Sequence, residues 1–199
     1  MIKKKVKAKK VLRRNPYLQS QVENILNELD PKNKINFEFI GEGYFGETYY
    51  FEINNNKLLH NVLLKPGKFI LKVFKTSEYK GIQPPSEKEI KYLIKLSKYG
   101  LIPEIYIINR RFEIMKYIDG ETLWNHVDNK GHLDGSYLVK LDKLVRKWHS
   151  LGFAHGDLGD DNILITKNNK LYLIDPLFDN KNEFNFDLDR LHYYWDKYV

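Results

Sequence analysis

The stretch HGDLGDDNILI, residues 155–165, places three aspartates and an asparagine close behind one histidine and then becomes apolar. Aspartate and asparagine are poor residues for the interior of a helix or strand, whereas isoleucine and leucine are typical of a buried strand. The stretch therefore predicts a loop that leads into a strand and holds oxygen atoms at its tip. These oxygens suit a metal ion or a proton, and an Asp-rich turn that only caps itself is the alternative.

A second short strand, LYLID, follows the turn KNNK and ends at Asp175. The hairpin that these two strands predict brings Asp175 close to Asn162, which precedes the first strand. A carboxylate and a side-chain carbonyl oxygen form a hard-oxygen site suited to Mg²⁺. Asp157 then stands apart as a proton acceptor or as a group that orients a hydroxyl.

The segment IGEGYFGET, residues 40–48, places Gly41, Gly43 and Gly46 between two expected strands. Glycine lets backbone N–H groups approach a phosphate without a Cβ in the way, although a hairpin turn also favours glycine. No Gly-Lys-Ser/Thr follows, so this is not a Walker A loop, and the strand that comes next argues against a dinucleotide-binding fold.

Lys72 lies in the middle of the expected strand FILKVF and shares a face with Ile70 and Phe74. A lysine on an otherwise apolar face needs a partner, unless its side chain extends to water. The helix expected after Ser86 carries Glu89 at the start of its apolar stripe. A buried Lys72–Glu89 pair would hold the ammonium group ready for an anion.

The remaining patterns predict a strand-rich half followed by a helix-rich half, with no internal repeat. We expect a basic tail at residues 1–14, an N-lobe with an N-terminal helix at 15–118 and a minimal C-lobe at 119–199. The expected helices lie near residues 16–29, 86–99, 136–151 and 187–199, and a further hairpin lies near 104–118.

These features occur along the chain in a characteristic order: the glycine-rich loop, the strand lysine, the helix glutamate, H-x-D-x-x-x-x-N and the strand-end aspartate. In that order the chain resembles the protein-kinase-like superfamily over roughly residues 36–190. The resemblance implies an α+β, two-lobed protein-kinase-like fold with a strand-rich N-lobe and a minimal helical C-lobe. It also implies ATP and Mg²⁺ as cofactors. The HGDL loop is similar to that of RIO-type kinases, of the small kinase in the tRNA-modification complex and of small-molecule kinases.

The resemblance also implies roles for single residues. Asp157 matches the catalytic aspartate, Lys72 matches the lysine that contacts the α- and β-phosphates, and Glu89 matches its helix partner. Asn162 and Asp175 match the two metal ligands. Met115 matches the gatekeeper that precedes the adenine-binding hinge, and the expected nucleotide-binding set is Gly41, Gly43, Phe45, Gly46, Ile70, Lys72, Met115, Lys116 and Ile118.

Several positions depart from the pattern of protein kinases. Gly156 replaces the arginine that reads a phosphorylated activation loop, and Gly159 replaces a lysine that helps to neutralise the transferred phosphoryl group. Pro176 follows the metal-binding aspartate in place of Phe-Gly, and Ile70 replaces a small residue that lines the adenine slot. No A-P-E motif follows, so we expect no control through a long activation segment.

Three functions remain open at this point. The first is a small atypical prokaryotic Ser/Thr protein kinase that also phosphorylates itself, favoured by the complete G-x-G-x-x-G. The second is a small-molecule kinase for a sugar or aminoglycoside-like hydroxyl, favoured by HGDL and disfavoured by the short C-lobe. The third is an ATPase module of an RNA- or protein-binding complex.

Charge and composition bear on partners and location. The net charge is +7, but residues 1–14 hold eight basic residues and no acid, so the rest of the chain is nearly neutral at −1. Such a tail suits an acidic partner, a nucleic acid or an anionic membrane, or it is simply a solvated arm. The chain has no cysteine and no apolar run that approaches the roughly 20 residues of a membrane span, so we expect a cytoplasmic protein that is not transmembrane.

Overall fold

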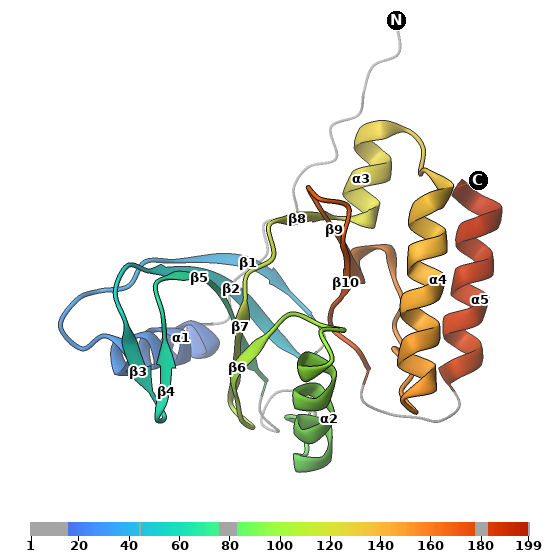
Figure 1. Cartoon of the computed structure of the whole chain (residues 1–199). Coiled ribbons are helices and arrows are strands. Elements are labelled where there is room, and N and C mark those ends of the chain that lie inside the picture. Colours follow the sequence, from blue (N-terminus) through green and yellow to red (C-terminus); the bar gives the residue numbers. More distant parts are fainter. Residues whose placement is uncertain (1–15, 44, 76–82, 178–182, 199) are drawn as a thin grey trace, which may run out of the picture.

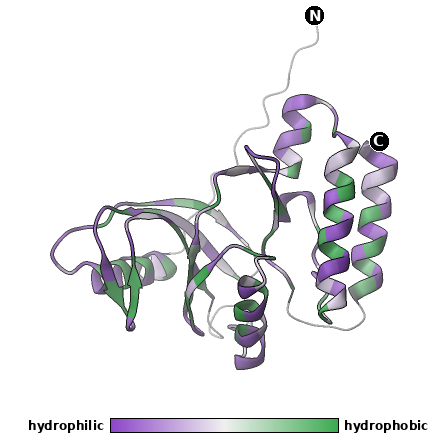
Figure 2. Cartoon of the chain, viewed as in Figure 1, coloured by the Kyte–Doolittle hydropathy of each residue, from purple (hydrophilic) through white to green (hydrophobic). Residues whose placement is uncertain are grey.

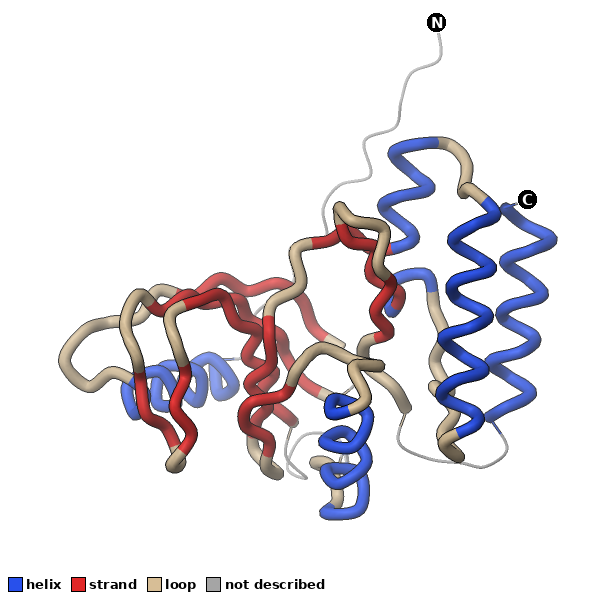
Figure 3. Tube along the Cα trace, viewed as in Figure 1, coloured by secondary structure: helices blue, strands red, loops and turns tan. Residues whose placement is uncertain are grey.

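The computed structural model describes residues 16–43, 45–75, 83–177 and 183–198 of the chain. Its elements form one lobe built on a five-stranded sheet and one lobe built mainly on helices, with a small sheet between them (Figure 1, Figure 3). This arrangement confirms the expected α+β, two-lobed kinase-like fold. The basic tail lies outside the described residues.

The large sheet is antiparallel throughout and has the strand order β1-β2-β5-β7-β6. Its register places Lys72 between Thr48 on one neighbouring strand and Glu113 on the other. Directly paired residues in a sheet point to the same face, so these three side chains share a face. The strands are β1 (Phe37–Glu42), β2 (Gly46–Ile53), β5 (Gly67–Phe74), β6 (Ile105–Ile108) and β7 (Phe112–Lys116).

Helix α1 (Pro16–Leu29) and the hairpin of β3 (Lys57–Leu59) and β4 (Val62–Leu64) complete the sheet lobe. The helix begins at a proline, which suits the first turn because proline has no N–H to leave unpaired. Its apolar stripe is buried in one hydrophobic cluster with the sheet residues Tyr49 and Leu71. This stripe consists of Leu18, Val22, Ile25, Leu26 and Leu29.

Helix α2 (Glu87–Lys98) starts at the expected cap, Ser86, whose hydroxyl accepts from the Glu89 N–H at 3.3 Å. Its buried residues Leu93 and Leu96 pack in a second hydrophobic cluster, with the core of the helical lobe. α2 therefore follows the sheet lobe in sequence but joins the helical lobe by its packing.

The helical lobe packs α4 (Gly135–Ser150) against α5 (Glu183–Tyr198). Hydrophobic and hydrophilic residues recur along both helices in the amphipathic pattern that this packing needs (Figure 2). Trp148 of α4 and Tyr194 of α5 are fully buried in the same hydrophobic cluster. The other elements are α3 (Leu123–Lys130), a 3₁₀ turn (Asp160–Asn162), and the small sheet β10 (Leu171–Leu173), β9 (Ile163–Thr166) and β8 (Gly120–Thr122).

The β3–β4 hairpin, β8 and α3 were not predicted from the sequence. The three strands have three residues each, which is too short for an alternating pattern to stand out. α3 buries only Leu123 and His126, so it carries almost no apolar stripe. Among the described helices, none combines the length and apolar character needed to cross a membrane.

Candidate active site

A cavity of about 980 Å³ opens between the two lobes. This volume lies in the range of sites that hold small molecules. Its wall contains most of the expected nucleotide-binding residues and both expected metal ligands: Gly41, Gly43, Ile70, Lys72, Met115, Lys116, Ile118, Asn162 and Asp175. Four other expected site residues, Phe45, Gly46, Glu89 and Asp157, are not part of this lining.

The glycine-rich turn is held tightly against the end of β5. The Gly43 N–H donates to the Gly46 carbonyl at 2.9 Å, and the Lys75 N–H donates to the Phe45 carbonyl at 2.8 Å. A Cβ on Gly46 would lie 2.1 Å from the Val73 carbonyl oxygen, so the close approach of the two strands requires glycine there. Gly46 thus shapes the turn, while Gly41 and Gly43 present their backbone to the cavity.

A buried lysine that the sequence analysis did not single out anchors this turn. The Lys75 ammonium group lies 2.8 Å from the Glu42 carboxylate and donates to the Gly43 carbonyl at 3.0 Å. Lys75 is only 6% exposed. It neutralises the Glu42 carboxylate, which lines the cavity and would otherwise repel an anion.

Lys72 projects from β5 into the cavity and is buried. Its ammonium group lies 2.7 Å from the Asp175 carboxylate, which comes from the segment after β10. One ion pair therefore joins the sheet lobe to the helical lobe inside the cavity.

Glu89 is not brought to Lys72. Its carboxylate accepts from the Ser86 N–H, so the side chain is occupied in capping its own helix. Further along the helix, Tyr92 and Lys95 lie against the Phe153 ring, with ring centroids of Tyr92 and Phe153 5.0 Å apart. These contacts hold α2 to the helical lobe.

A different glutamate, Glu113 of β7, lies beside Lys72. It is 5% exposed, and burial raises its pKa to about 7, although the nearby Lys72 charge limits the rise. Sequence reasoning missed it, yet the signal was present, since a lone glutamate lies between Phe112 and Ile114 in a strand whose neighbours are buried.

The segment after α4 forms the loop that carries Asp157 and Asn162. Asp157 is exposed, and its carboxylate and its backbone carbonyl both accept from the Asn162 amide, at 3.0 Å and 2.9 Å. The donor side of the Asn162 amide is thus occupied, which leaves its carbonyl oxygen to bind a cation. Burial lowers the pKa of His155, so the neutral ring donates through Nε2 to the Ile174 carbonyl at 3.0 Å.

Asp187 of α5 holds this loop through hydrogen bonds. It is fully buried, and its carboxylate accepts from the N–H groups of His155 at 2.7 Å and Gly156 at 3.0 Å. The ring of His149 lies 2.9 Å from the same carboxylate. Asp189, two residues further along α5, is exposed instead.

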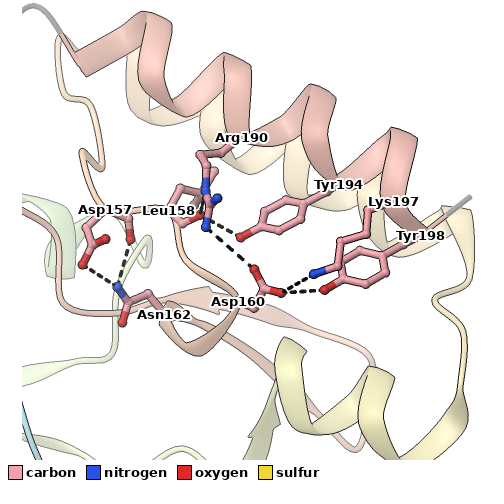
Figure 4. Close-up of polar contacts among 8 residues, drawn as sticks. All are labelled: Asp157, Leu158, Asp160, Asn162, Arg190, Tyr194, Lys197 and Tyr198. Carbon is pink, nitrogen blue, oxygen red and sulfur yellow. Dashed lines mark hydrogen bonds and ion pairs between the residues drawn. The ribbon is translucent and has the colours of Figure 1, made fainter.

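The C-terminal part of α5 also contacts the loop through hydrogen bonds and ion pairs (Figure 4). Tyr194 donates its hydroxyl to the Leu158 carbonyl at 2.7 Å. Tyr198 donates to the Asp160 carboxylate, and the Lys197 ammonium group lies 3.6 Å from it. Burial opposes the ionisation of Asp160, but the Tyr198 hydrogen bond and the positive charges of Lys197 and Arg190 help to hold its pKa below its usual value.

The β9–β10 hairpin brings Asp175 to Asn162. The Ile174 N–H donates to the backbone carbonyl of Asn162 at 3.0 Å, which leaves the side-chain oxygen of Asn162 free of this bond. Asp175 itself has a left-handed φ of 55°. This donor set fits Mg²⁺, which is usually bound by one or two protein oxygens with phosphate and water completing its shell. No group of three or more His, Cys, Asp or Glu side chains that could cage a metal occurs among the described residues.

The segment that follows β7 presents backbone groups to the cavity. The N–H groups of Lys116 and Tyr117 donate to the carbonyls of Glu104 and Lys68, at 2.8 Å and 3.2 Å. In the described part of the chain, the Ile118 N–H donates to no protein acceptor. It lines the cavity with a free donor, as hydrogen bonding to a base requires.

Comparisons with known proteins agree with this geometry. The family model for the RIO domain matches residues 49–177. Serine/threonine-protein kinase SKS1 of Saccharomyces cerevisiae is 23% identical over 137 residues, which cover 64% of this chain and 27% of the yeast protein. The probable serine/threonine-protein kinase KIN1 homolog of Enterocytozoon bieneusi is 37% identical over 88 residues, 42% of this chain and 14% of that protein.

Sperm motility kinase 2B of Mus musculus is 28% identical over 98 residues, which cover 46% of this chain and 20% of the mouse protein. The chain therefore spans between about a seventh and a quarter of the length of these relatives.

Proposed function

The chain belongs to the RIO domain family, and from that premise we propose that it transfers the γ-phosphoryl group of ATP to serine or threonine hydroxyl groups of proteins, its own included. The observation that carries the proposal is the Lys72–Asp175 ion pair inside a cavity that Asn162 also lines. A cation and two hard-oxygen donors at one end of a nucleotide-sized cavity suit a metal-bound triphosphate. Two of the relatives are named serine/threonine-protein kinases, which supports a protein acceptor.

In this proposal the two lobes, residues 15–118 and 119–199, hold ATP at their joint. The adenine lies between Ile70 and the hinge at Met115–Ile118, where the free Ile118 N–H donates to the base. The backbone of Gly41 and Gly43 covers the phosphates, and Lys72 binds the α- and β-phosphates.

Asp157 orients the acceptor hydroxyl and takes its proton as the new oxygen–phosphorus bond forms and ADP leaves. Asn162 and Asp175 would hold Mg²⁺, which would neutralise charge on the phosphates. The bond between Asn162 and Asp157 keeps the proton acceptor and the metal ligand in fixed relation. Asp187 and α5 support both by bracing the loop that carries them.

The test is intact-mass spectrometry of the purified chain after incubation with Mg-ATP, beside an Asp157→Ala control. We expect added phosphate on the wild type alone, and peptide mapping then identifies serine or threonine as the acceptor. No added phosphate on a chain that binds Mg-ATP would overturn self-phosphorylation.

Two other functions have specific support. A small-molecule kinase is favoured by Gly156 and Gly159 in the loop, and would release ADP only with a hydroxyl-bearing metabolite. An ATPase module that binds an acidic partner, RNA or an anionic membrane is favoured by the basic residues 1–14. For RNA, binding that falls steeply with salt and is lost when the tail is removed would support the second alternative.

A further inference from the structure

Glu113 carries a buried carboxylate close to the charge of Lys72. It is 5% exposed, and its side chain makes no hydrogen bond or ion pair with any described residue. Burying a carboxylate without a partner is costly, so a protein retains one mainly where the group has a task.

The sheet places this carboxylate next to Lys72. The two residues are paired directly across β5 and β7, where side chains on one face start about 5 Å apart. Both line a small cavity of about 30 Å³, which Asp175 also lines. The rest of that cavity is apolar, including Phe74 and Leu93. Lys72 therefore shares this small cavity with two carboxylates, and in this structure it bonds to Asp175.

The helix offers no alternative partner. Glu89 caps α2 through Ser86, and α2 is held to the helical lobe by Leu93, Leu96 and the Tyr92–Phe153 contact. For Glu89 to reach Lys72, the capping box would have to break and the helix would have to leave this packing.

We propose that Glu113 is the acidic partner that positions Lys72 during phosphoryl transfer, in place of a glutamate from helix α2. This inference rests on the proposed function. Once Asp175 serves as a metal ligand, its carboxylate is shared, and the Lys72 ammonium group turns toward Glu113 while it binds the phosphates.

The sheet and the charge of Lys72 support this role. Burial opposes the ionisation of Glu113 and raises its pKa to about 7, whereas the positive charge of Lys72 favours the ionised form. Both residues lie on a rigid antiparallel sheet rather than on two elements that move separately. The position of Lys72 is then independent of the position of α2, so movement of this helix does not switch the site on or off.

The test compares Glu113→Gln with Glu89→Gln, and takes Glu87→Gln, an exposed position in the same turn of α2, as the baseline. Phosphate transfer and ATP turnover are measured together with the midpoint of thermal unfolding. We expect Glu113→Gln to lower kcat about tenfold or more, and much more than Glu89→Gln does. KM for ATP should change little, because two effects on ATP binding offset each other. Loss of the Glu113 charge reduces repulsion of the phosphates, while Lys72 is held less well in the orientation that binds them. Glu113→Asp should recover part of kcat.

Two further measurements separate positioning from a structural role. Glu113→Gln should unfold at the same or a higher temperature than wild type, since it removes a buried charge. In a Lys72→Met background it should have no further effect on kcat, because Glu113 acts through Lys72.

The outcomes separate this inference from the proposed function. A wild type that neither binds nor turns over Mg-ATP would overturn both. An active wild type in which Glu89→Gln loses kcat while Glu113→Gln matches Glu87→Gln would overturn this inference alone. This inference would also be overturned if Glu113→Gln lowered kcat by the same factor in the wild type and in the Lys72→Met background.

Discussion

The Lys72 ammonium group lies 2.7 Å from the Asp175 carboxylate, although the two residues are 103 positions apart. The pair links the large sheet to the β9–β10 hairpin within the cavity. Lys72 is well buried, whereas the Asp175 side chain is 40% exposed, so Asp175 is the more accessible of the two to an incoming cation. The same two groups serve the phosphates and the metal in the proposed reaction.

Asp175→Ala should weaken the response to Mg²⁺. Loss of the carboxylate leaves Asn162 as the one assigned protein ligand, and we expect the Mg²⁺ concentration for half-maximal activity to rise by about tenfold or more. A Mg²⁺ titration at saturating ATP measures this. An unchanged titration curve would mean that the metal binds elsewhere.

Asp157→Ala should lower turnover by about 10²- to 10⁴-fold, the usual contribution of a positioned proton acceptor. Affinity for Mg-ATP should remain close to wild type, since Asp157 is not part of the cavity lining. Calorimetry and single-turnover kinetics measure the two quantities separately. Full activity in this variant would contradict the assignment of the catalytic loop.

Asp187→Ala should destabilise the fold by about 3–5 kcal/mol, because two loop N–H groups and His149 lose a fully buried acceptor. Urea unfolding measures this change. Asp189→Ala, two residues on and exposed, is the matched control and should stay within about 0.5 kcal/mol of wild type. Equal losses of stability in the two variants would show that the effect does not come from the hydrogen bonds of Asp187 to the loop.

The wild type should lose stability as pH rises because of Glu113, and Glu113→Gln should remove this loss. The pKa of Glu113 is about 7 in the folded chain and 4.5 for the free group. The folded chain therefore keeps a proton that the unfolded chain has released, and stability falls as pH rises between these values and then levels off. The full difference is roughly 3 kcal/mol.

Urea unfolding at about pH 5 and about pH 8 measures this difference. The stability gained by Glu113→Gln should be small at the lower pH and large at the higher one. The exposed variant Glu87→Gln should show no such trend. A gain that is equal at both pH values would mean that Glu113 titrates normally.

The purified chain should be active without prior phosphorylation. Gly156 occupies the place of the arginine that reads a phosphorylated loop, and its N–H is held by Asp187 instead. Progress curves that start with freshly dephosphorylated protein should be linear. A lag that disappears after pre-incubation with ATP would contradict this expectation.

Much of the fold follows from local sequence patterns. The apolar stripes of α1, α2 and α4 and the glycine-rich turn predict those elements, because the 3.6-residue and two-residue periods depend on near neighbours alone. The order of the motifs then predicts the two-lobed fold and the meeting of Asn162 with Asp175, since one short hairpin joins them. The three-residue strands of β3, β4 and β8 carry too little pattern to be recognised.

The partner of Lys72 was decided only by the tertiary structure. From the sequence, Glu89 was the expected partner, because a glutamate at the start of a helix near a strand lysine fits the motif order. Whether it reaches Lys72 depends on where α2 docks, and its leucines dock it on the core of the helical lobe. Glu113 lies beside Lys72 because of strand register, which is set by pairing between residues far apart in the chain, so the local pattern indicates a buried glutamate but not its neighbour.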